Sequence, residues 1–183
     1  GYPVGDFVVP IVPAAILMDL LVGKAGVRPS AHMGYAACEA ASDAPVEQGS
    51  VGAGTGCRVG LALGADYCSK GGIGSAAISL DGGLVVAAVA AVNAFGDVVN
   101  DDGSILAGTR NPADPTQFMG TLNILKTMHA HGVQGGATVI GVVATNAKLT
   151  KEHVNKVAQM AQDGLARAVN PAHTMYDGDT IFA

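Results

Sequence analysis

Thr138 is the residue of this sequence whose position most invites chemistry. It lies in the stretch GGATVIGVVATNA, residues 135 to 147, directly after Ala137 and directly before an apolar strand. A threonine hydroxyl is a weak nucleophile unless a base adjoins it, and one solution is the residue's own α-amino group, exposed when the chain is cut just before it. The glycine turn, the small residue and the following strand suit such a cut. The same pattern also fits an ordinary β-branched residue that begins a strand.

Four other polar side chains could assist such a nucleophile. Asp177 and Asp179 flank a glycine just before an apolar strand, so their carboxylates could orient a hydroxyl or an amine. The alternative is an Asx-type turn. Asn93 ends a long strand and could donate to an oxyanion, or make local hydrogen bonds only. Lys70, in SKGGIGS, is either a charge near a site or a solvated loop lysine.

Two other features could bind a cofactor or a metal. The stretch VGAGTG, residues 51 to 56, has glycines like those of a phosphate-binding loop. It follows a polar turn rather than a strand, however, and no P-loop lysine follows in register, so a glycine-lined bend is the better interpretation. The histidines have no carboxylate or cysteine partner at ligand spacing, so we expect neither a metal nor a cofactor. They are His32, His129, His131, His153 and His173.

The composition argues against several classes of partner. Of the 183 residues, 49% are hydrophobic and 14% charged, and the formal net charge is -5. A negative charge and few aromatic residues argue against a nucleic-acid partner. The longest apolar run, residues 7 to 23, is interrupted by prolines and an aspartate, so we expect no membrane span. The three cysteines form no CxxC pair, which favours reduced thiols and a cytoplasmic location.

Periodicity and capping signals predict how these residues are positioned. Strands are expected at residues 7 to 12, 75 to 80, 84 to 92 and 139 to 146, and at the very end of the chain. Helices are expected at residues 13 to 21, 31 to 41 (capped by Ser30), 118 to 131 and 151 to 169 (capped by Thr150). Asp81-Gly82-Gly83 turns a hairpin. Residues 100 to 117 are expected to be loop, and 132 to 136 a glycine-rich turn.

Hairpins rather than regular βαβ alternation predict an α+β fold with mostly antiparallel sheets. The length suits one domain over residues 1 to 183. The sequence stops on TIFA, which reads as the middle of a strand, so we expect the chain to be a fragment of a longer one.

Taken together, several segments resemble the L-aminopeptidase/D-esterase (DmpA-type) family, which includes β-aminopeptidases and nylon-oligomer hydrolase. The segments are VPIVPAAILMDL, VGAGTG, KGGIGSA, VNAFGDV, IGVVATNAKLT, MAQDGLARAVNPAHT and DGDTIFA. The resemblance implies a four-layer αββα sandwich and N-terminal-nucleophile hydrolysis of small amide, ester or peptide substrates. It also implies a precursor that cuts itself into an α chain, here residues 1 to 137, and a β chain, here 138 to 183. The two parts would stay together in a homo-oligomer of α/β heterodimers.

The resemblance also assigns roles to individual residues. The family nucleophile falls on Thr138, and the cut on the Ala137-Thr138 bond. Asp177 and Asp179 match a carboxylate pair that orients the nucleophile in the nylon-hydrolase branch. Asn93 matches an oxyanion-hole asparagine, and Lys70 matches a lysine near the nucleophile.

The sequence departs from the family pattern on both sides of the nucleophile. Members with a threonine nucleophile usually have Asn before it and a second Thr after it, where this chain has Ala137 and Val139. Met18 stands where several members carry a substrate-facing Tyr. An Ala-Thr cut also occurs in the ornithine acetyltransferase family, so acetyl transfer from acetylornithine to glutamate is an alternative function. A non-catalytic binding domain of the same fold is another.

Overall fold

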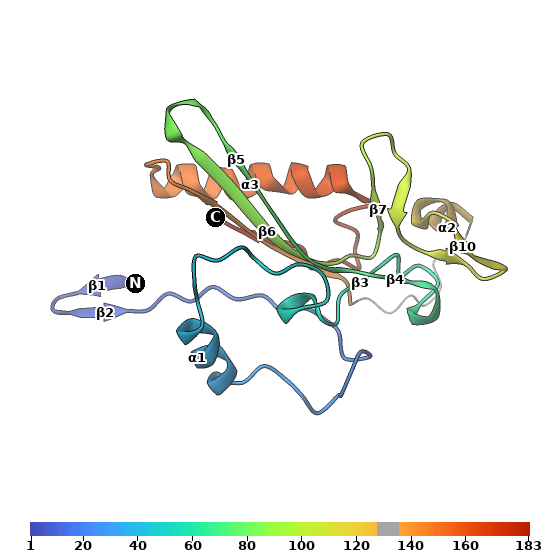
Figure 1. The fold of residues 1–183 in the computed structure, drawn as a ribbon, viewed down its shortest axis with the longest axis horizontal. Helices are drawn as coiled ribbons and strands as arrows, with labels where there is room; N and C mark the ends of the chain where they lie inside the picture. The colour runs from blue at the N-terminus through green and yellow to red at the C-terminus, as the bar shows by residue number, and fades with distance from the viewer. Residues whose placement is uncertain (128–135) are drawn as a thin grey trace.

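The computed structural model of the chain describes residues 1 to 127 and 136 to 183, and these form an α+β fold built on one main sheet (Figure 1). The main sheet has the strand order β13-β11-β6-β5. These strands are Thr180–Phe182, Thr138–Thr145, Val85–Asn93 and Gly72–Ser79. Neighbouring strands are antiparallel except β11 and β13, which are parallel. The sheet confirms the α+β class. The four-layer sandwich stays a prediction for the whole protein.

The hairpin of β5 and β6 and the strand β11 confirm the sequence prediction. Asp81–Gly83 turns the hairpin as a short 3-10 helix, and Gly82 there has a φ of 77°, which glycine adopts without strain. β11 is antiparallel to β6 along its whole length, from Thr138 opposite Asn93 to Thr145 opposite Val86. The pairing places the beginning of β11 beside the end of β6.

Helix α3, Lys151–Ala168, also follows the prediction and runs along the main sheet (Figure 1). The Thr150 hydroxyl accepts a hydrogen bond from the His153 N–H at 3.3 Å, which caps the first turn. Because α3 connects the parallel strands β11 and β13, these three elements form one βαβ unit within an otherwise antiparallel sheet.

Residues 100 to 117 were expected to be loop, and this prediction is wrong. They contain β8 (Ile105–Ala107), β9 (Arg110–Asn111) and most of β10 (Asp114–Phe118). β8 pairs with β7 (Asp97–Val99), which also pairs with β12 (Val169–Asn170). Strands of two to five residues are too short for a visible alternation of apolar and polar residues, which is why the sequence pattern missed them. The helix expected at 118 to 131 begins as α2, Thr121–Thr127, and residues 128 to 131 lie outside the described range.

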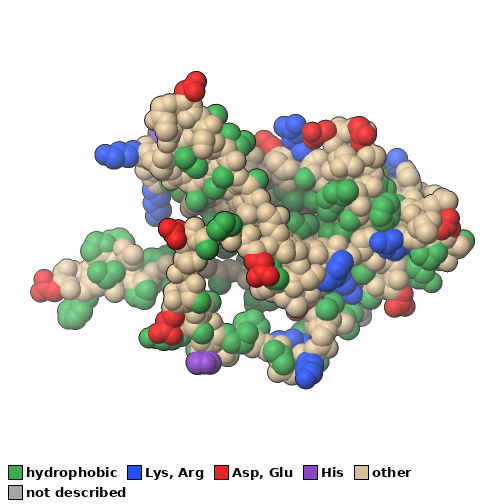
Figure 2. Space-filling model, in the orientation of Figure 1, with side chains coloured by type: hydrophobic (Ala, Val, Ile, Leu, Met, Phe, Trp, Pro, Cys, Tyr) green, Lys and Arg blue, Asp and Glu red, His purple; other side chains and the backbone are tan. Residues whose placement is uncertain are grey.

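Most of the segment before residue 50 is exposed and lies outside the two clusters of buried side chains that form the core, although the Met18 carbonyl accepts a hydrogen bond from Asn93 (Figure 1). It contains the hairpin of β1 (Tyr2–Val4) and β2 (Phe7–Val9) and helix α1 (Ala31–Glu39), whose Ser30 cap was predicted correctly. The helix expected at 13 to 21 is not formed, and the strand expected at 7 to 12 ends at Val9. A helix this short needs an apolar face packed against the core, whereas Ile16 and Leu21 are 84% and 79% exposed. Figure 2 shows hydrophobic side chains along this segment.

Two clusters of buried side chains form the core beside the main sheet. One centres on Val59, Ala94, Val139 and Val169, and the other on Ala62, Phe95, Ile124 and Ala137. Short elements complete this region: β3 (Arg58–Val59), β4 (Ser69–Lys70) and the 3-10 turns Gly52–Gly54 and Ala65–Tyr67. Within the described ranges, no helix is both long and apolar enough to cross a membrane.

Candidate active site

The Ala137-Thr138 bond lies at the buried beginning of β11. Ala137 is 2% exposed and Thr138 8%. Ala137 forms a parallel bridge with Asp177, in which the Ala137 N–H donates to the Tyr176 carbonyl and the Gly178 N–H donates to the Ala137 carbonyl at 2.9 Å. The Thr138 hydroxyl donates to the same Ala137 oxygen at 2.5 Å. A side-chain hydroxyl and a backbone N–H therefore meet at one carbonyl group.

Asn93 lies opposite Thr138 in the pairing of β6 with β11 and is fully buried. Its amide oxygen accepts from the Arg58 N–H at 3.0 Å. Its amide nitrogen donates to the carbonyls of Met18 and Gly136, both at 3.3 Å. The side-chain amide is thus close to the Ala137-Thr138 bond, but its N–H groups are directed to the carbonyls of Met18 and Gly136 rather than to that of Ala137.

Asp177 and Asp179 reach the same region from the turn before β13. Asp177 accepts from the Phe95 N–H and, through its other oxygen, from the N–H and hydroxyl of Thr174. One Asp179 oxygen accepts from the Val139 N–H at 2.8 Å. Asp177 therefore ties the turn to Phe95, the second residue after β6, while Asp179 holds the backbone directly after Thr138.

Lys70 has its hydrogen bonds elsewhere. The ammonium group donates to the carbonyls of Gly54, Thr55 and Cys57, at 3.4, 2.6 and 3.1 Å. Lys70 is connected to the site through β3. Arg58 of β3 is the partner of Lys70 in the β3–β4 pair, and the Arg58 N–H also donates to Asn93. The structure thus brings Thr138, Asn93, Asp177 and Asp179 together and places Lys70 at the edge of the group.

The contacts of Lys70 also explain the glycine-rich stretch VGAGTG. This loop directs carbonyl oxygens at a cation, whereas a phosphate-binding loop directs N–H groups at an anion. A Cβ on Gly54 would lie 2.4 Å from the backbone nitrogen of Ile73, so close approach of two backbones requires glycine there. Among the residues that the structure describes, no cluster of three His, Cys, Asp or Glu side chains could hold a metal ion. His129 and His131 lie outside the described residues.

Sequence reasoning missed His173 as a neighbour of the site. The His173 Nδ1 lies 2.8 Å from the second oxygen of Asp179, and the backbone N–H of His173 donates to that oxygen at 3.3 Å. His173 has a φ of 52°, a left-handed conformation that is uncommon for residues other than glycine. Its position six residues before Asp179, in the same short segment, was the one available signal.

Burial raises the pKa of Cys57, a cysteine close to the site. Cys57 is fully buried, and this burial raises the pKa of its thiol to about 11, against a smaller opposing effect of the Lys70 ammonium. Cys57 is therefore held as a neutral thiol at physiological pH and is unsuited to act as a nucleophile.

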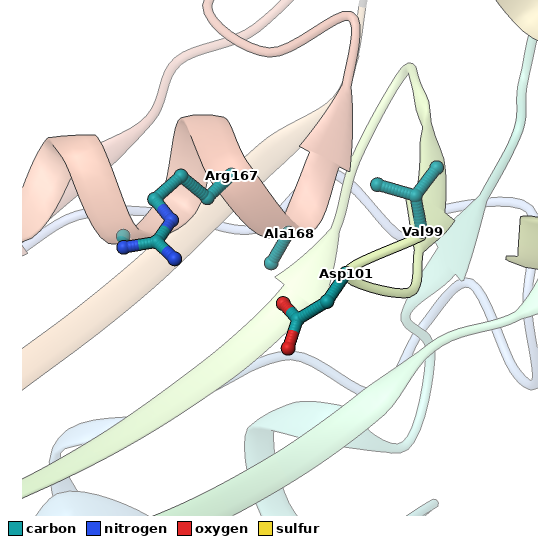
Figure 3. Close-up of a pocket in the computed structure, with 5 residues that line it drawn as sticks. Val99, Asp101, Arg167 and Ala168 are labelled. Carbon is teal, nitrogen blue, oxygen red and sulfur yellow. The ribbon is translucent and has the colours of Figure 1, made fainter. Parts of the chain in front are cut away.

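A cavity of about 250 Å³ lies away from these residues, between the end of α3 and the segment after β7 (Figure 3). In Figure 3 the Arg167 side chain comes from α3 and the Asp101 side chain from the segment after β7. Val99, Gly164 and Ala168 complete its lining. None of the predicted site residues lines it.

Comparison with known proteins identifies the family. The model of peptidase family S58 matches residues 3 to 183. The chain belongs to peptidase family S58. It is 43% identical, over 190 residues, to an uncharacterised aminopeptidase of Mycobacterium leprae, covering 96% of this chain and 49% of the relative. It is 28% identical to a 6-aminohexanoate-oligomer endohydrolase of Paenarthrobacter ureafaciens, covering 94% of this chain and 49% of that protein.

A solved structure is also similar to this S58 chain. It is the L-aminopeptidase D-Ala-esterase/amidase of Ochrobactrum anthropi, with a TM-score of 0.49 and 21% identity over 76% of this chain and 32% of that one. The chain spans about half the length of the curated relatives that it matches.

Proposed function

We propose that this chain carries the nucleophile of a self-processing hydrolase of amides, esters or short peptides, and that the nucleophile is Thr138. The observation that carries the proposal is the 2.5 Å contact between the Thr138 hydroxyl and the carbonyl oxygen of Ala137, in a buried site. Membership of peptidase family S58 supports hydrolysis of amide bonds. The family therefore supports the type of reaction, and the contact supports the choice of Thr138 as the nucleophile.

The first reaction is the cut of the chain's own Ala137-Thr138 bond. The Thr138 Oγ adds to the Ala137 carbonyl carbon, and the tetrahedral intermediate collapses by breaking the bond to the Thr138 nitrogen, which keeps the proton lost from the hydroxyl. The product is an ester between Ala137 and the Thr138 side chain. Water then hydrolyses this ester, which gives a carboxylate on Ala137 and restores the hydroxyl beside a free α-amine.

The second reaction is turnover on a substrate. The α-amine of Thr138 takes the proton of the Thr138 hydroxyl as Oγ attacks the substrate carbonyl, and water later releases the acyl group. Asp179, which accepts from the Val139 N–H, holds the backbone of the nucleophile. Asn93 donates to the oxyanion, because the cut detaches Gly136, whose carbonyl accepts from the Asn93 amide in the uncut chain. Asp177 fixes the turn that carries Asp179, and Lys70 supports the loop beside Asn93.

Strand pairing supports the proposal that both parts stay together after the cut. The part from 138 to 183 contains β11, which lies between β6 and β13 in the main sheet. The pairing of β11 with β6 continues as far as Thr145 and does not involve the Ala137-Thr138 bond. The part from 1 to 137 therefore keeps the hydrogen bonds between β6 and β11 after the cut.

The names of the relatives support small substrates. One group is named aminopeptidase and another 6-aminohexanoate-oligomer endohydrolase. The first name describes cleavage of an amide next to a free amine, and the second describes cleavage within an oligomer of an amino acid. We propose the same class here, namely amides and esters of small amino-acyl groups.

Intact mass and N-terminal sequencing of the full-length protein test the proposal. We expect wild-type protein to contain a new chain that begins at Thr138, and Thr138→Ala to remain one chain without activity on aminoacyl p-nitroanilides. Thr145→Ala is a matched control, because Thr145 ends the same strand and donates to the Val85 carbonyl, away from the bond. An uncut wild-type protein, or a cut Thr138→Ala protein, would contradict the proposal.

A further inference from the structure

Gly178 lies against the bond that Thr138 is proposed to cut. Its N–H donates to the Ala137 carbonyl oxygen at 2.9 Å. A Cβ on Gly178 would lie 3.0 Å from the Thr138 Oγ and 4.0 Å from the Thr138 Cγ2. Gly178 is also exposed, so it lies between the buried bond and solvent.

The N–H of Gly178 is held in place before any reaction begins. In a parallel bridge, one residue hydrogen-bonds to the two residues that flank its partner. Ala137 follows this pattern, bonding to Tyr176 through its N–H and to Gly178 through its carbonyl. The Asp177 carboxylate fixes the same turn by accepting from the Phe95 and Thr174 N–H groups. The donor therefore needs no reorganisation when charge appears on the Ala137 oxygen.

Charge does appear on that oxygen during the cut. When Oγ bonds to the Ala137 carbon, the hydroxyl can no longer donate to the oxygen, which becomes an oxyanion. The Asn93 amide donates to Met18 and Gly136 instead, so it does not serve this oxyanion in the uncut chain. Gly178 is the donor that stays in contact throughout. A fixed donor aimed at a developing oxyanion accelerates acyl transfer by about 10²–10³-fold.

Residue 178 needs to be glycine because a larger residue would have too little space, and not because of its backbone conformation. Its φ lies outside the left-handed region that would require glycine, so an alanine could adopt the backbone. The alanine Cβ, however, would press on the Thr138 Oγ at a distance tighter than ordinary van der Waals contact. Because Thr138 is β-branched, its side chain cannot easily rotate away.

We propose that Gly178 is a catalytic residue of the self-cleavage, whose backbone N–H stabilises the oxyanion on Ala137 and whose missing side chain leaves room for the Thr138 hydroxyl. This inference rests on the proposed function, because it assumes that Thr138 attacks Ala137.

Cell-free synthesis of the full-length protein allows both halves of the proposal to be tested by pulse-chase. A suppressor tRNA carrying glycolate replaces the Asp177-Gly178 amide by an ester, which removes the N–H and adds no atom larger than oxygen. Gly178→Ala keeps the N–H and adds the Cβ. Gly74→Ala is the matched control, because a Cβ on Gly74, in β5 of the same sheet, would meet no atom within 4 Å. Limited proteolysis shows which chains have folded.

We expect the ester to slow appearance of the Thr138 N-terminus by about 10²–10³-fold. Gly178→Ala should slow it by at least about tenfold, whereas Gly74→Ala should cut at the wild-type rate. Hydroxylamine, which cleaves the ester formed by the acyl shift, should not restore the rate, because the oxyanion precedes that ester.

A folded variant with the backbone ester that cuts at the wild-type rate would overturn the role of the N–H, as would rescue by hydroxylamine. If the ester variant does not fold, wild-type cutting by Gly178→Ala overturns the proposal. An uncut wild-type protein would instead refute the proposed function itself.

Discussion

Replacing Asp179 by asparagine is the sharpest test of how the backbone beside Thr138 is held. The Asp179 side chain is 4% exposed and accepts from three donors. One oxygen accepts from the Val139 N–H at 2.8 Å. The other accepts from the His173 N–H at 3.3 Å and lies 2.8 Å from the His173 Nδ1. Asparagine has almost the same shape, so the change alters the donors and acceptors without leaving a cavity.

The expected cost follows from counting these groups. If the asparagine oxygen accepts from the Val139 N–H, the asparagine NH₂ group faces the backbone N–H and the Nδ1 of His173. A change of imidazole tautomer turns Nδ1 into an acceptor, but the backbone N–H stays a donor without an acceptor. The opposite orientation directs the NH₂ group at the Val139 N–H. Either way at least one donor loses an ionised acceptor, a loss of about 1–3 kcal/mol, with the lower end expected where that donor belongs to the 39% exposed His173. We expect Asp179→Asn to lower the free energy of unfolding by that amount.

Urea unfolding in a Thr138→Ala background measures this difference, because every variant then has the same uncut chain. Asp163→Asn is the control, since Asp163 is exposed on α3. A double-mutant cycle with His173→Asn isolates the pair, and asparagine suits that position because it tolerates the left-handed φ of 52°. We expect a coupling energy of about 0.5–3 kcal/mol. An Asp179→Asn variant as stable as the Asp163→Asn control, or a coupling energy near zero, would refute the reasoning.

Two further predictions concern buried groups outside the reacting bond. Cys57, whose pKa is raised to about 11 by burial, should react with a disulfide reagent at pH 8 only after unfolding, whereas the exposed Cys38 should react at once; mass spectrometry of labelled peptides distinguishes them. Asp97 is 2% exposed and accepts from the Thr109 N–H and from the N–H and hydroxyl of Thr121. Asp97→Asn should therefore cost about 1.5–3 kcal/mol in urea unfolding, and a loss no larger than that of an exposed Asp→Asn change would contradict this.

The elements that could be predicted from the sequence carry strong local signals. Thr150 caps α3, and the Asp81-Gly82-Gly83 turn joins two long apolar strands, so no distant contact is needed to recognise either. The helix expected at 13 to 21 failed because its apolar residues form no buried face, as the 84% exposed Ile16 and the 79% exposed Leu21 show. Apolar spacing describes a face that could be buried, but the contacts of the folded chain decide whether it is.

The neighbourhood of Thr138 could be anticipated only in part. Thr138 stood out because a glycine turn ends and a strand begins there, and Asn93 because it ends a strand. The resemblance to a family, and not the spacing, connected them with Asp177 and Asp179. Lys70 illustrates the limit of that approach, because its ammonium group donates to carbonyls of the 54 to 57 loop. Contacts of this kind depend on how a loop folds back, which no periodicity describes.

A single structural feature accounts for the rest of the arrangement, namely the parallel pairing of the segment at Ala137 with the segment at Asp177. Such a pairing needs a crossover, and α3 provides it, so residues about forty positions apart become neighbours. Once Ala137 lies opposite Asp177, the ladder directs the Gly178 N–H to the Ala137 carbonyl, and Asp179 follows beside the Val139 N–H. The middle residue of the DGD stretch is therefore placed at the bond as closely as its carboxylates are, because its N–H donates to the Ala137 carbonyl and its missing side chain leaves space beside the Thr138 hydroxyl.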